Sequence, residues 1–220
     1  MDIKEMLTHI DHTQLKAFAS YDDIKKLCDE ALVYNTASVC IPPAYVADVK
    51  RDYGDRLKIC TVIGFPLGYM TTAVKLFETA DAVKNGADEI DMVINVGRLK
   101  AGEDDYVAEE IKAVRAACRG LILKVIVETC YLNEDEKKRI CRIVSDCGAD
   151  YIKTSTGFGT AGATADDIRL FKANIDPGVK MKAAGGIRTL SALREFLELG
   201  CERVGASATA DFAKEAASEN

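Results

Sequence analysis

The chain has 220 residues, 48% of them hydrophobic, and 35 acidic against 29 basic side chains give a formal net charge of -6. This composition is typical of a globular protein, and the length suits one domain, residues 1–220, with a large buried core. The acidic balance argues against nucleic acid or an anionic membrane as the main partner. A small anionic substrate in a local basic pocket remains open.

The cysteines and the N-terminus indicate where the chain works. Eight cysteines show neither a paired metal spacing nor a secreted disulfide framework, and MDIKE at the start does not resemble a signal peptide. The most apolar run, 121–127, is too short for a membrane span and contains Lys124. We therefore expect a cytoplasmic protein with reduced thiols. With only His9 and His12, histidine-rich metal sites and serine triads lack their parts, and no metal or cofactor is expected.

Short β-branched runs alternate with helical patterns along the chain, which is typical of a parallel sheet built from βα units. Eight strands are predicted, centred on 10–12, 38–41, 59–63, 89–93, 123–127, 151–154, 179–182 and 203–205. Between them, Ser20 and Asn133 are predicted to cap helices, and the second of these helices should stop at Gly148. The fold class predicted is α/β, a (β/α)8 TIM barrel.

A weak internal repeat places side chains at matching depths. The repeated segments are 86–91 and 148–153, with a looser copy at 200–205. In each, a glycine closes a helix in the left-handed conformation, and a strand follows. Inward side chains at one height of such a barrel come from alternate strands. Asp91, Lys153 and Gly205 are therefore predicted to share one layer.

Lys153 is the candidate nucleophile. Lysine is rarely buried without a reason, and a desolvated amine beside a second cation becomes neutral and reactive near pH 7. Lys182 could supply that cation: alternation puts Lys180, Lys182 and Ala184 on one strand face, with Lys182 toward the carboxyl end, where active sites of barrels lie. The sequence therefore predicts an enzyme that forms a Schiff base.

Glycine-rich loops suggest an anion site at the same end of the barrel. Gly185 and Gly186 lead into a helix, whose exposed N–H groups favour phosphate, and Arg188 adds charge. Phosphate sites in barrels favour the loops after strands seven and eight, which fits these glycines and the segment 205–207. The segment 156–160 could close the third side.

Each of these signals has a structural alternative. Lys153 could lie at a sheet edge with its amine in water, and Asp91 could simply pair with a lysine of a neighbouring strand. The double glycine could be a tight turn. Cys40 is more easily a buried thiol than a nucleophile because no histidine is placed to activate it. His12 could be a proton carrier or, more readily, a structural hydrogen-bonding group.

Several motifs, in this order, resemble those of the deoxyribose-phosphate aldolases, most closely the shorter bacterial form. They are Asp11-His12-Thr13, Ser38-Val39-Cys40, Glu89–Asn95, Glu128–Leu132, Lys153–Phe158 and Gly185–Thr189, and they cover essentially the whole chain. The resemblance implies a (β/α)8 barrel, with Lys153 as the Schiff-base lysine and Asp91 and Lys182 as the proton-handling pair. It implies a lyase of carbohydrate and deoxyribonucleotide breakdown that reversibly splits 2-deoxy-D-ribose 5-phosphate into acetaldehyde and D-glyceraldehyde 3-phosphate.

The substrate contacts expected from the motifs and loops are Asp11, Thr13, Cys40, Thr156, Gly157, Gly185, Gly186, Arg188, Gly205 and Ser207. A homodimer through helix faces is open to such a barrel, although no sequence feature identifies the face. Two other hypotheses remain: a barrel with a phosphate site and different chemistry, such as another lysine-dependent aldolase or a sugar-phosphate isomerase, and a non-catalytic barrel that only binds a phosphorylated ligand.

Overall fold

The computed structural model describes residues 1–218, and its strands close into a parallel barrel in which neighbours in sequence are neighbours in space. The strands are β1 (Ile10–Thr13), β2 (Ser38–Ile41), β3 (Ile59–Ile63), β4 (Glu89–Val93), β5 (Ile122–Ile126), β6 (Tyr151–Lys153), β7 (Lys180–Ala184) and β8 (Arg203–Ala206). β8 pairs with β1 and closes the ring. The predicted fold class and all eight strands are confirmed.

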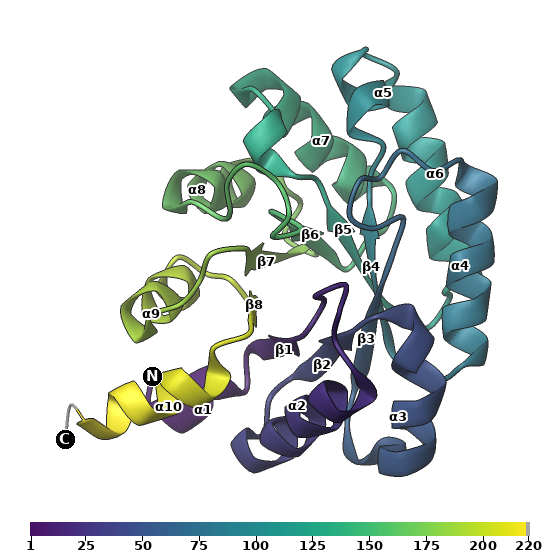
Figure 1. Ribbon diagram of the computed structural model, residues 1–220. Coiled ribbons are helices and arrows are strands. Elements are labelled where there is room, and N and C mark those ends of the chain that lie inside the picture. Colours follow the sequence, from purple (N-terminus) through teal and green to yellow (C-terminus); the bar gives the residue numbers. More distant parts are fainter. Residues whose placement is uncertain (219–220) are drawn as a thin grey trace.

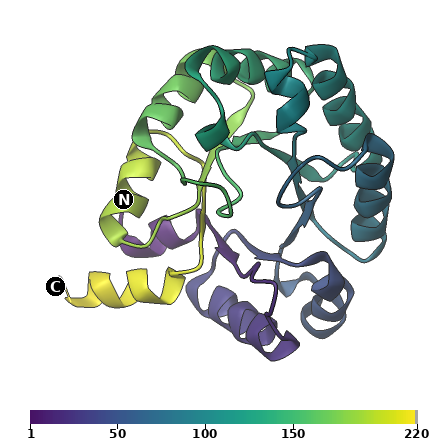
Figure 2. The ribbon, with the colours of Figure 1, turned by 45° about the horizontal axis from the view of Figure 1, so that its top comes forward.

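The helices surround the barrel (Figures 1 and 2). They are α1 (Ile3–Leu7), α2 (Tyr21–Tyr34), α3 (Val46–Tyr53), α4 (Thr72–Lys84), α5 (Val96–Lys100), α6 (Asp104–Ala117), α7 (Glu134–Asp146), α8 (Ala165–Asn174), α9 (Leu190–Glu198) and α10 (Thr209–Ser218), with short 3-10 turns at Pro43–Tyr45, Gly54–Arg56 and Thr129–Tyr131. α1 and α10 lie side by side, which brings both ends of the described chain together (Figure 1). Within residues 1–218, no helix is long and apolar enough to cross a membrane.

Local sequence signals fix the helix ends. Ser20 and Asp23 form a capping box at the start of α2, and Asn133 and Glu136 form another at the start of α7. Gly148, just after α7, has a φ of 70°, a left-handed conformation that glycine adopts without a steric penalty. These predicted boundaries are confirmed.

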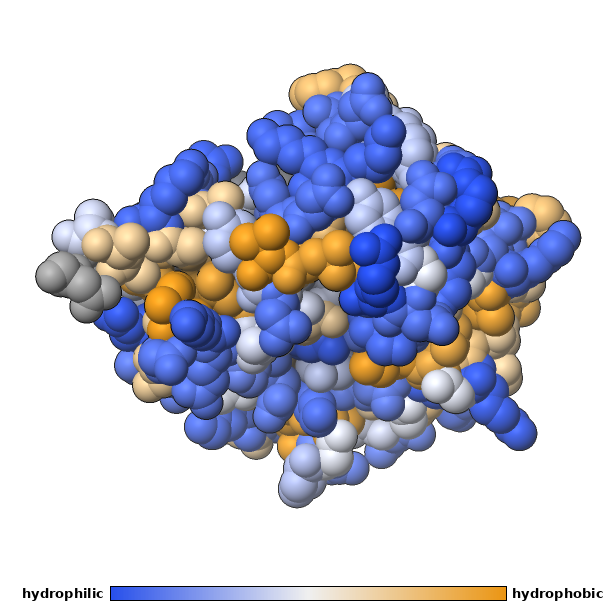
Figure 3. Space-filling model, turned by 90° about the horizontal axis from the view of Figure 1, so that it is seen from below, coloured by the Kyte–Doolittle hydropathy of each residue, from blue (hydrophilic) through white to orange (hydrophobic). Residues whose placement is uncertain are grey.

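The two faces of the strands have opposite chemistry. Outward side chains such as Ile90, Val125 and Ile152 are fully buried against the helices in the main hydrophobic core. His12 also faces outward, where its ring nitrogens contact Glu30 at 2.9 Å and the Thr209 hydroxyl at 2.8 Å. The structural interpretation of His12 is therefore correct. The surface seen from below is largely hydrophilic, with apolar side chains in separate groups (Figure 3).

The inward side chains form four layers of four. Following the register around the barrel, alternate strands contribute one residue each to a layer. The layer at the amino ends of the strands is Ser38, Glu89, Tyr151 and Arg203. The second layer is Asp11, Cys60, Lys124 and Lys182, and the third is Cys40, Asp91, Lys153 and Gly205. The layer at the carboxyl ends is Thr13, Val62, Ile126 and Ala184. The predicted grouping of Asp91, Lys153 and Gly205 is confirmed.

The position of Lys182 differs from the prediction. β7 runs to Ala184, two residues beyond the expected end, so Lys182 lies at the middle of the strand and one layer below Lys153. The reason is that Ala183 and Ala184, although weak strand formers, are buried in the barrel and pair with β8.

Candidate active site

Asp91 is the centre of the polar interior. One carboxylate oxygen lies 2.6 Å from the Lys153 amine and 2.8 Å from the Lys182 amine, and the other lies 2.8 Å from the Lys124 amine. Burial alone would raise the pKa of Asp91, but the three ammonium groups outweigh it and hold the pKa well below its usual range. Asp91 is thus a fixed anion shared by three lysines. The structural alternative for Asp91 was a pairing with a lysine of a neighbouring strand. Asp91 makes this contact, with Lys124, and it also contacts the two predicted site lysines.

Lys182 is a fully buried cation. Its amine contacts both Asp11 and Asp91. Burial lowers the pKa of Lys182, but the two carboxylates more than reverse this effect and raise it above the usual value. Asp11 responds in the opposite sense: burial raises its pKa, and Lys182, Lys124 and Arg203 together bring it below the usual range. The pair therefore stays charged.

The floor of the site is made by residues that the sequence reasoning missed. The Lys124 amine lies 2.5 Å from the Glu89 carboxylate, and Arg203 donates to the other oxygen of Glu89 at 2.8 Å. Burial lowers the pKa of Lys124, but Asp91 and its neighbours outweigh this and raise the pKa well above the usual value. Both cations occupy inward positions of their strands, so strand alternation could have revealed them.

The charges of this interior balance without Lys153. Three cations and three carboxylates contact one another there: Lys124, Lys182, Arg203, Asp11, Glu89 and Asp91. A protonated Lys153 adds one positive charge that no further carboxylate of the described cluster matches. Lys153 therefore contacts Asp91 as an amine outside this set of matched charges.

A cavity of about 200 Å³ lies above Lys153. Its wall contains eight of the predicted contacts, Thr13, Thr156, Gly157, Gly185, Gly186, Arg188, Gly205 and Ser207, together with Lys153 itself. The structure places Asp11, Cys40, Asp91 and Lys182 beneath the cavity, fully buried. Of the predicted catalytic residues, only Lys153, 3% exposed, thus reaches the space that a ligand could enter.

Two loops shape this cavity. The backbone N–H of Ala163 donates to the carbonyl of Ala184 at 3.0 Å, and a Cβ on Gly162 would lie 2.0 Å from the Gly185 carbonyl oxygen. The loop after β6 therefore packs backbone to backbone on the loop after β7, and Gly162 permits the approach.

Glu128 holds the loop after β6 from the other side. Its backbone has a φ of 53°, rare outside glycine, and its carboxylate accepts hydrogen bonds from the hydroxyl and the backbone N–H of Thr156, the latter at 3.2 Å. Glu128 follows β5 on the face of Lys124, which would allow a pairing with one of the lysines, but in the structure its carboxylate binds Thr156 instead. The motif 128–132 marked this position, but its sequence carried no signal for a contact with the next loop.

The sequence and fold can now be compared with known proteins. The family model described as DeoC/LacD family aldolase matches residues 5–210. The chain belongs to this aldolase family. A deoxyribose-phosphate aldolase of Clostridium botulinum (strain Alaska E43 / Type E3) is 55% identical over 207 residues, covering 94% of each chain. That of Clostridioides difficile (strain 630) is 51% identical over 212 residues, covering 96% of this chain and 97% of the relative.

Solved structures agree with the sequence comparison. The tetrameric deoxyribose phosphate aldolase of Aeropyrum pernix superposes with a TM-score of 0.92 at 26% identity, covering all of this chain and 94% of the other. The protein is therefore an aldolase, a lyase of carbon–carbon bonds, and the polar barrel interior with the cavity above Lys153 is its candidate active site.

Proposed function

We propose that this aldolase reversibly cleaves 2-deoxy-D-ribose 5-phosphate into acetaldehyde and D-glyceraldehyde 3-phosphate through a Schiff base on Lys153. The observation that carries the proposal is the position of Lys153. It is the one catalytic candidate on the cavity wall, and it lies above an interior whose other charges already balance. The relatives named deoxyribose-phosphate aldolase support the choice of substrate.

The first steps attach the sugar to the protein. The neutral amine of Lys153 attacks the aldehyde carbon of the open-chain sugar, and the resulting carbinolamine loses water to give an iminium ion. The iminium withdraws electrons from the adjacent methylene carbon. It thereby makes accessible a carbanion equivalent that would be too unstable at neutral pH.

The cleavage step breaks the bond between the second and third carbons of the sugar. A base takes the proton of the hydroxyl on the third carbon, the carbonyl of glyceraldehyde 3-phosphate forms, and an enamine stays on Lys153. Protonation of the enamine and hydrolysis of the new iminium release acetaldehyde.

Asp91 and Lys182 would handle protons beneath the reacting carbons. The amines of Lys153 and Lys182 contact the same oxygen of Asp91, so Asp91 can exchange a proton with groups on Lys153, directly or with water at the cavity floor. The raised pKa of Lys182 suits a cation that keeps its own proton and stabilises negative charge on Asp91.

The phosphate would bind at the far side of the cavity. Gly185 and Gly186 both have positive φ values, and their loop precedes α9. Arg188 and Ser207, both exposed on the cavity wall, could add a charge and a hydroxyl donor. Asp11, under the wall, would act through Lys182 rather than by touching the sugar.

Three further points belong to this proposal. The chain would act as a single catalytic domain on a small phosphorylated sugar, without nucleic acid. It would work in the cytoplasm, as its eight free cysteines suggest. A homodimer is one assembly that fits a barrel with exposed helices, and the tetramer of the Aeropyrum pernix enzyme shows that a related barrel assembles.

Turnover of the proposed substrate tests the function. Purified protein is incubated with 2-deoxyribose 5-phosphate, and acetaldehyde and glyceraldehyde 3-phosphate are quantified separately. We expect both products in equal amounts, and none from Lys153→Ala. The matched control is Lys180→Ala, because Lys180 is an exposed lysine near the end of the adjacent strand. An isomerised sugar phosphate as product, or binding without turnover in the wild type, would refute the proposal.

A further inference from the structure

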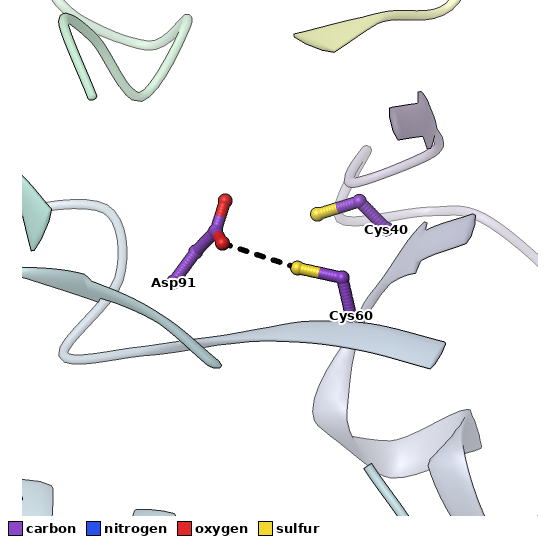
Figure 4. Close-up of side chains that lie close together, drawn as sticks. All are labelled: Cys40, Cys60 and Asp91. Atoms are coloured by element: carbon purple, nitrogen blue, oxygen red, sulfur yellow. Dashed lines mark hydrogen bonds between the residues drawn. The ribbon is translucent and has the colours of Figure 1, made fainter. Parts of the chain in front are cut away.

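Cys40 and Cys60 lie side by side inside the barrel. They are register partners on β2 and β3, both are fully buried, and both point inward. Their sulfur atoms and a carboxylate oxygen of Asp91 lie within 4.8 Å of one another (Figure 4). The chain therefore has two thiols facing each other directly beneath its candidate active site.

The strand geometry suits a bond between these two sulfurs. Neighbouring strands lie about 4.8 Å apart, and paired Cα atoms at such separations fall within the roughly 4.4–6.8 Å that disulfides span. Because both side chains already point to the same face, rotation about the side-chain bonds can bring the sulfurs together. The backbone of the barrel need not move.

The two thiols are chemically unequal. Hydrogen bonding with Cys60, assisted by the charge of Lys182, lowers the pKa of Cys40 against the opposing effect of burial. Burial raises the pKa of Cys60 well above the usual value, so Cys60 keeps its proton. The pair thus resembles an attacking thiolate with a resolving thiol beside it.

We propose that Cys40 and Cys60 form a reversible disulfide when the protein meets hydrogen peroxide, and that this bond switches the aldolase off. The Cys40 sulfur attacks a peroxide oxygen, the O–O bond breaks, and Cys40 becomes a sulfenic acid as water leaves. The Cys60 sulfur then attacks the Cys40 sulfur, the S–O bond breaks, and the hydroxyl leaves as a second water with the Cys60 proton. The two thiols lose two electrons, which reduce the peroxide.

Cys40 and Cys60 are fully buried, so an oxidant would have to enter their layers from the cavity. Gly205 adds no side chain to the layer that contains Cys40, and Lys153 of the same layer borders the cavity. Any aldehyde that reacts with Lys153 must come to this layer, and a peroxide is smaller than such an aldehyde.

The bond would disturb the proposed proton path. The single S–H of Cys60 can point to Cys40 or to Asp91, whose oxygen lies 3.2 Å from the Cys60 sulfur, and the Lys124 amine lies 3.3 Å from that sulfur. A disulfide sulfur has no proton to donate, and the S–S bond of about 2.05 Å draws Cys60 toward Cys40 and away from Asp91. The loss of activity rests on the proposed role of Asp91, whereas formation of the disulfide does not.

Metal binding by the same groups is less favourable. Two thiols and a carboxylate are a donor set that zinc accepts. Three lysine amines already occupy the oxygens of Asp91, however, and a divalent ion would have to displace them from a site with no spare negative charge. Oxidation instead displaces none of these lysines from Asp91.

The test treats the reduced protein with hydrogen peroxide and reads mass and activity separately. Peptide mapping after alkylation identifies any cross-link, and aldol cleavage is assayed before and after dithiothreitol. We expect a linked Cys40–Cys60 peptide, the loss of two hydrogen atoms, and an activity about tenfold to 100-fold lower that dithiothreitol restores. Cys60→Ser should form no cross-link. Cys130→Ser should behave as wild type, since Cys130 is a partly exposed thiol outside the barrel interior.

Two results would overturn the proposal. If the peroxide-treated wild-type protein remains folded and yields no peptide linking Cys40 to Cys60, the proposed disulfide does not form. This conclusion holds whatever the result for Cys60→Ser. If the link forms and cleavage proceeds at the original rate, the switch is wrong. Neither result bears on whether the untreated protein cleaves deoxyribose 5-phosphate, which the turnover of the reduced enzyme decides.

Discussion

Replacement of Lys182 by methionine removes one buried charge and keeps a side chain of similar length. In the wild-type protein the cations beneath Lys153 balance the carboxylates. In Lys182→Met two cations, Lys124 and Arg203, face three carboxylates, and the interior balances only when Lys153 keeps its proton. We therefore expect Lys182→Met to reduce attack by Lys153 at neutral pH.

The size of the effect follows from one distance. The amines of Lys153 and Lys182 lie 2.6 and 2.8 Å from the same oxygen of Asp91, so they are at most about 5.4 Å apart. Two unit charges at that distance repel by about 3 kcal/mol at an effective dielectric constant of about 20. Loss of this repulsion corresponds to a rate at pH 7 that is lower by roughly 100-fold.

The assay compares kcat/KM for deoxyribose 5-phosphate between about pH 6 and pH 10. Lys182→Met should regain part of the lost rate at the alkaline end, where the Lys153 amine loses its proton without help. Lys180→Met is the control, since Lys180 lies two residues earlier on the same strand and is exposed. Circular dichroism confirms that each variant is folded.

Wild-type kcat/KM at pH 7 in folded Lys182→Met would refute the charge argument. A loss of kcat/KM that is the same at every pH would also contradict the charge argument, because it would assign Lys182 to proton transfer alone.

Three other predictions follow from the same contacts. Lys124→Met should lower the free energy of unfolding by about 3–5 kcal/mol in urea titration, because it leaves buried carboxylates without a partner; an unchanged midpoint would contradict this. Because the pKa of Asp91 is lower in the folded protein than the value of about 4 in the unfolded chain, ionised Asp91 stabilises the fold above about pH 4, and this stabilisation is lost as the pH falls further. Asp91→Asn should therefore make the urea midpoint depend less on pH between about pH 5 and pH 2. Gly162→Ala should raise KM on the order of tenfold by pushing against Gly185, while Gly178→Ala, with open space around it, should not; equal KM values would exclude the loop contact.

Much of the fold could be predicted because its signals are local. The eight strands are β-branched runs between helices, and Gly86, Gly148 and Gly200, each after a helix, mark where β4, β6 and β8 begin. Strand alternation and the rule of alternate strands then place Asp91 and Lys153 at one depth, and the structure confirms it with a contact of 2.6 Å. Strand ends were less certain, and β7 ends two residues later than expected.

The floor of the site could not be predicted from local signals. Lys124 looked like a break in an apolar run and Arg203 like the start of a strand, because their partners lie far away in sequence. Only the closed register shows that both meet Glu89 inside the barrel. The contact of Glu128 with Thr156 is of the same kind, since it joins two loops whose approach depends on the whole ring.

Borohydride trapping tests the central proposal most directly. The protein is mixed with 2-deoxyribose 5-phosphate, reduced, digested and mapped by mass spectrometry, so that any iminium becomes a stable secondary amine. We predict one adduct, on Lys153. An adduct on Lys182, or none in folded protein that has bound the sugar, would contradict the account of Lys153 as the nucleophile above a charge-balanced barrel.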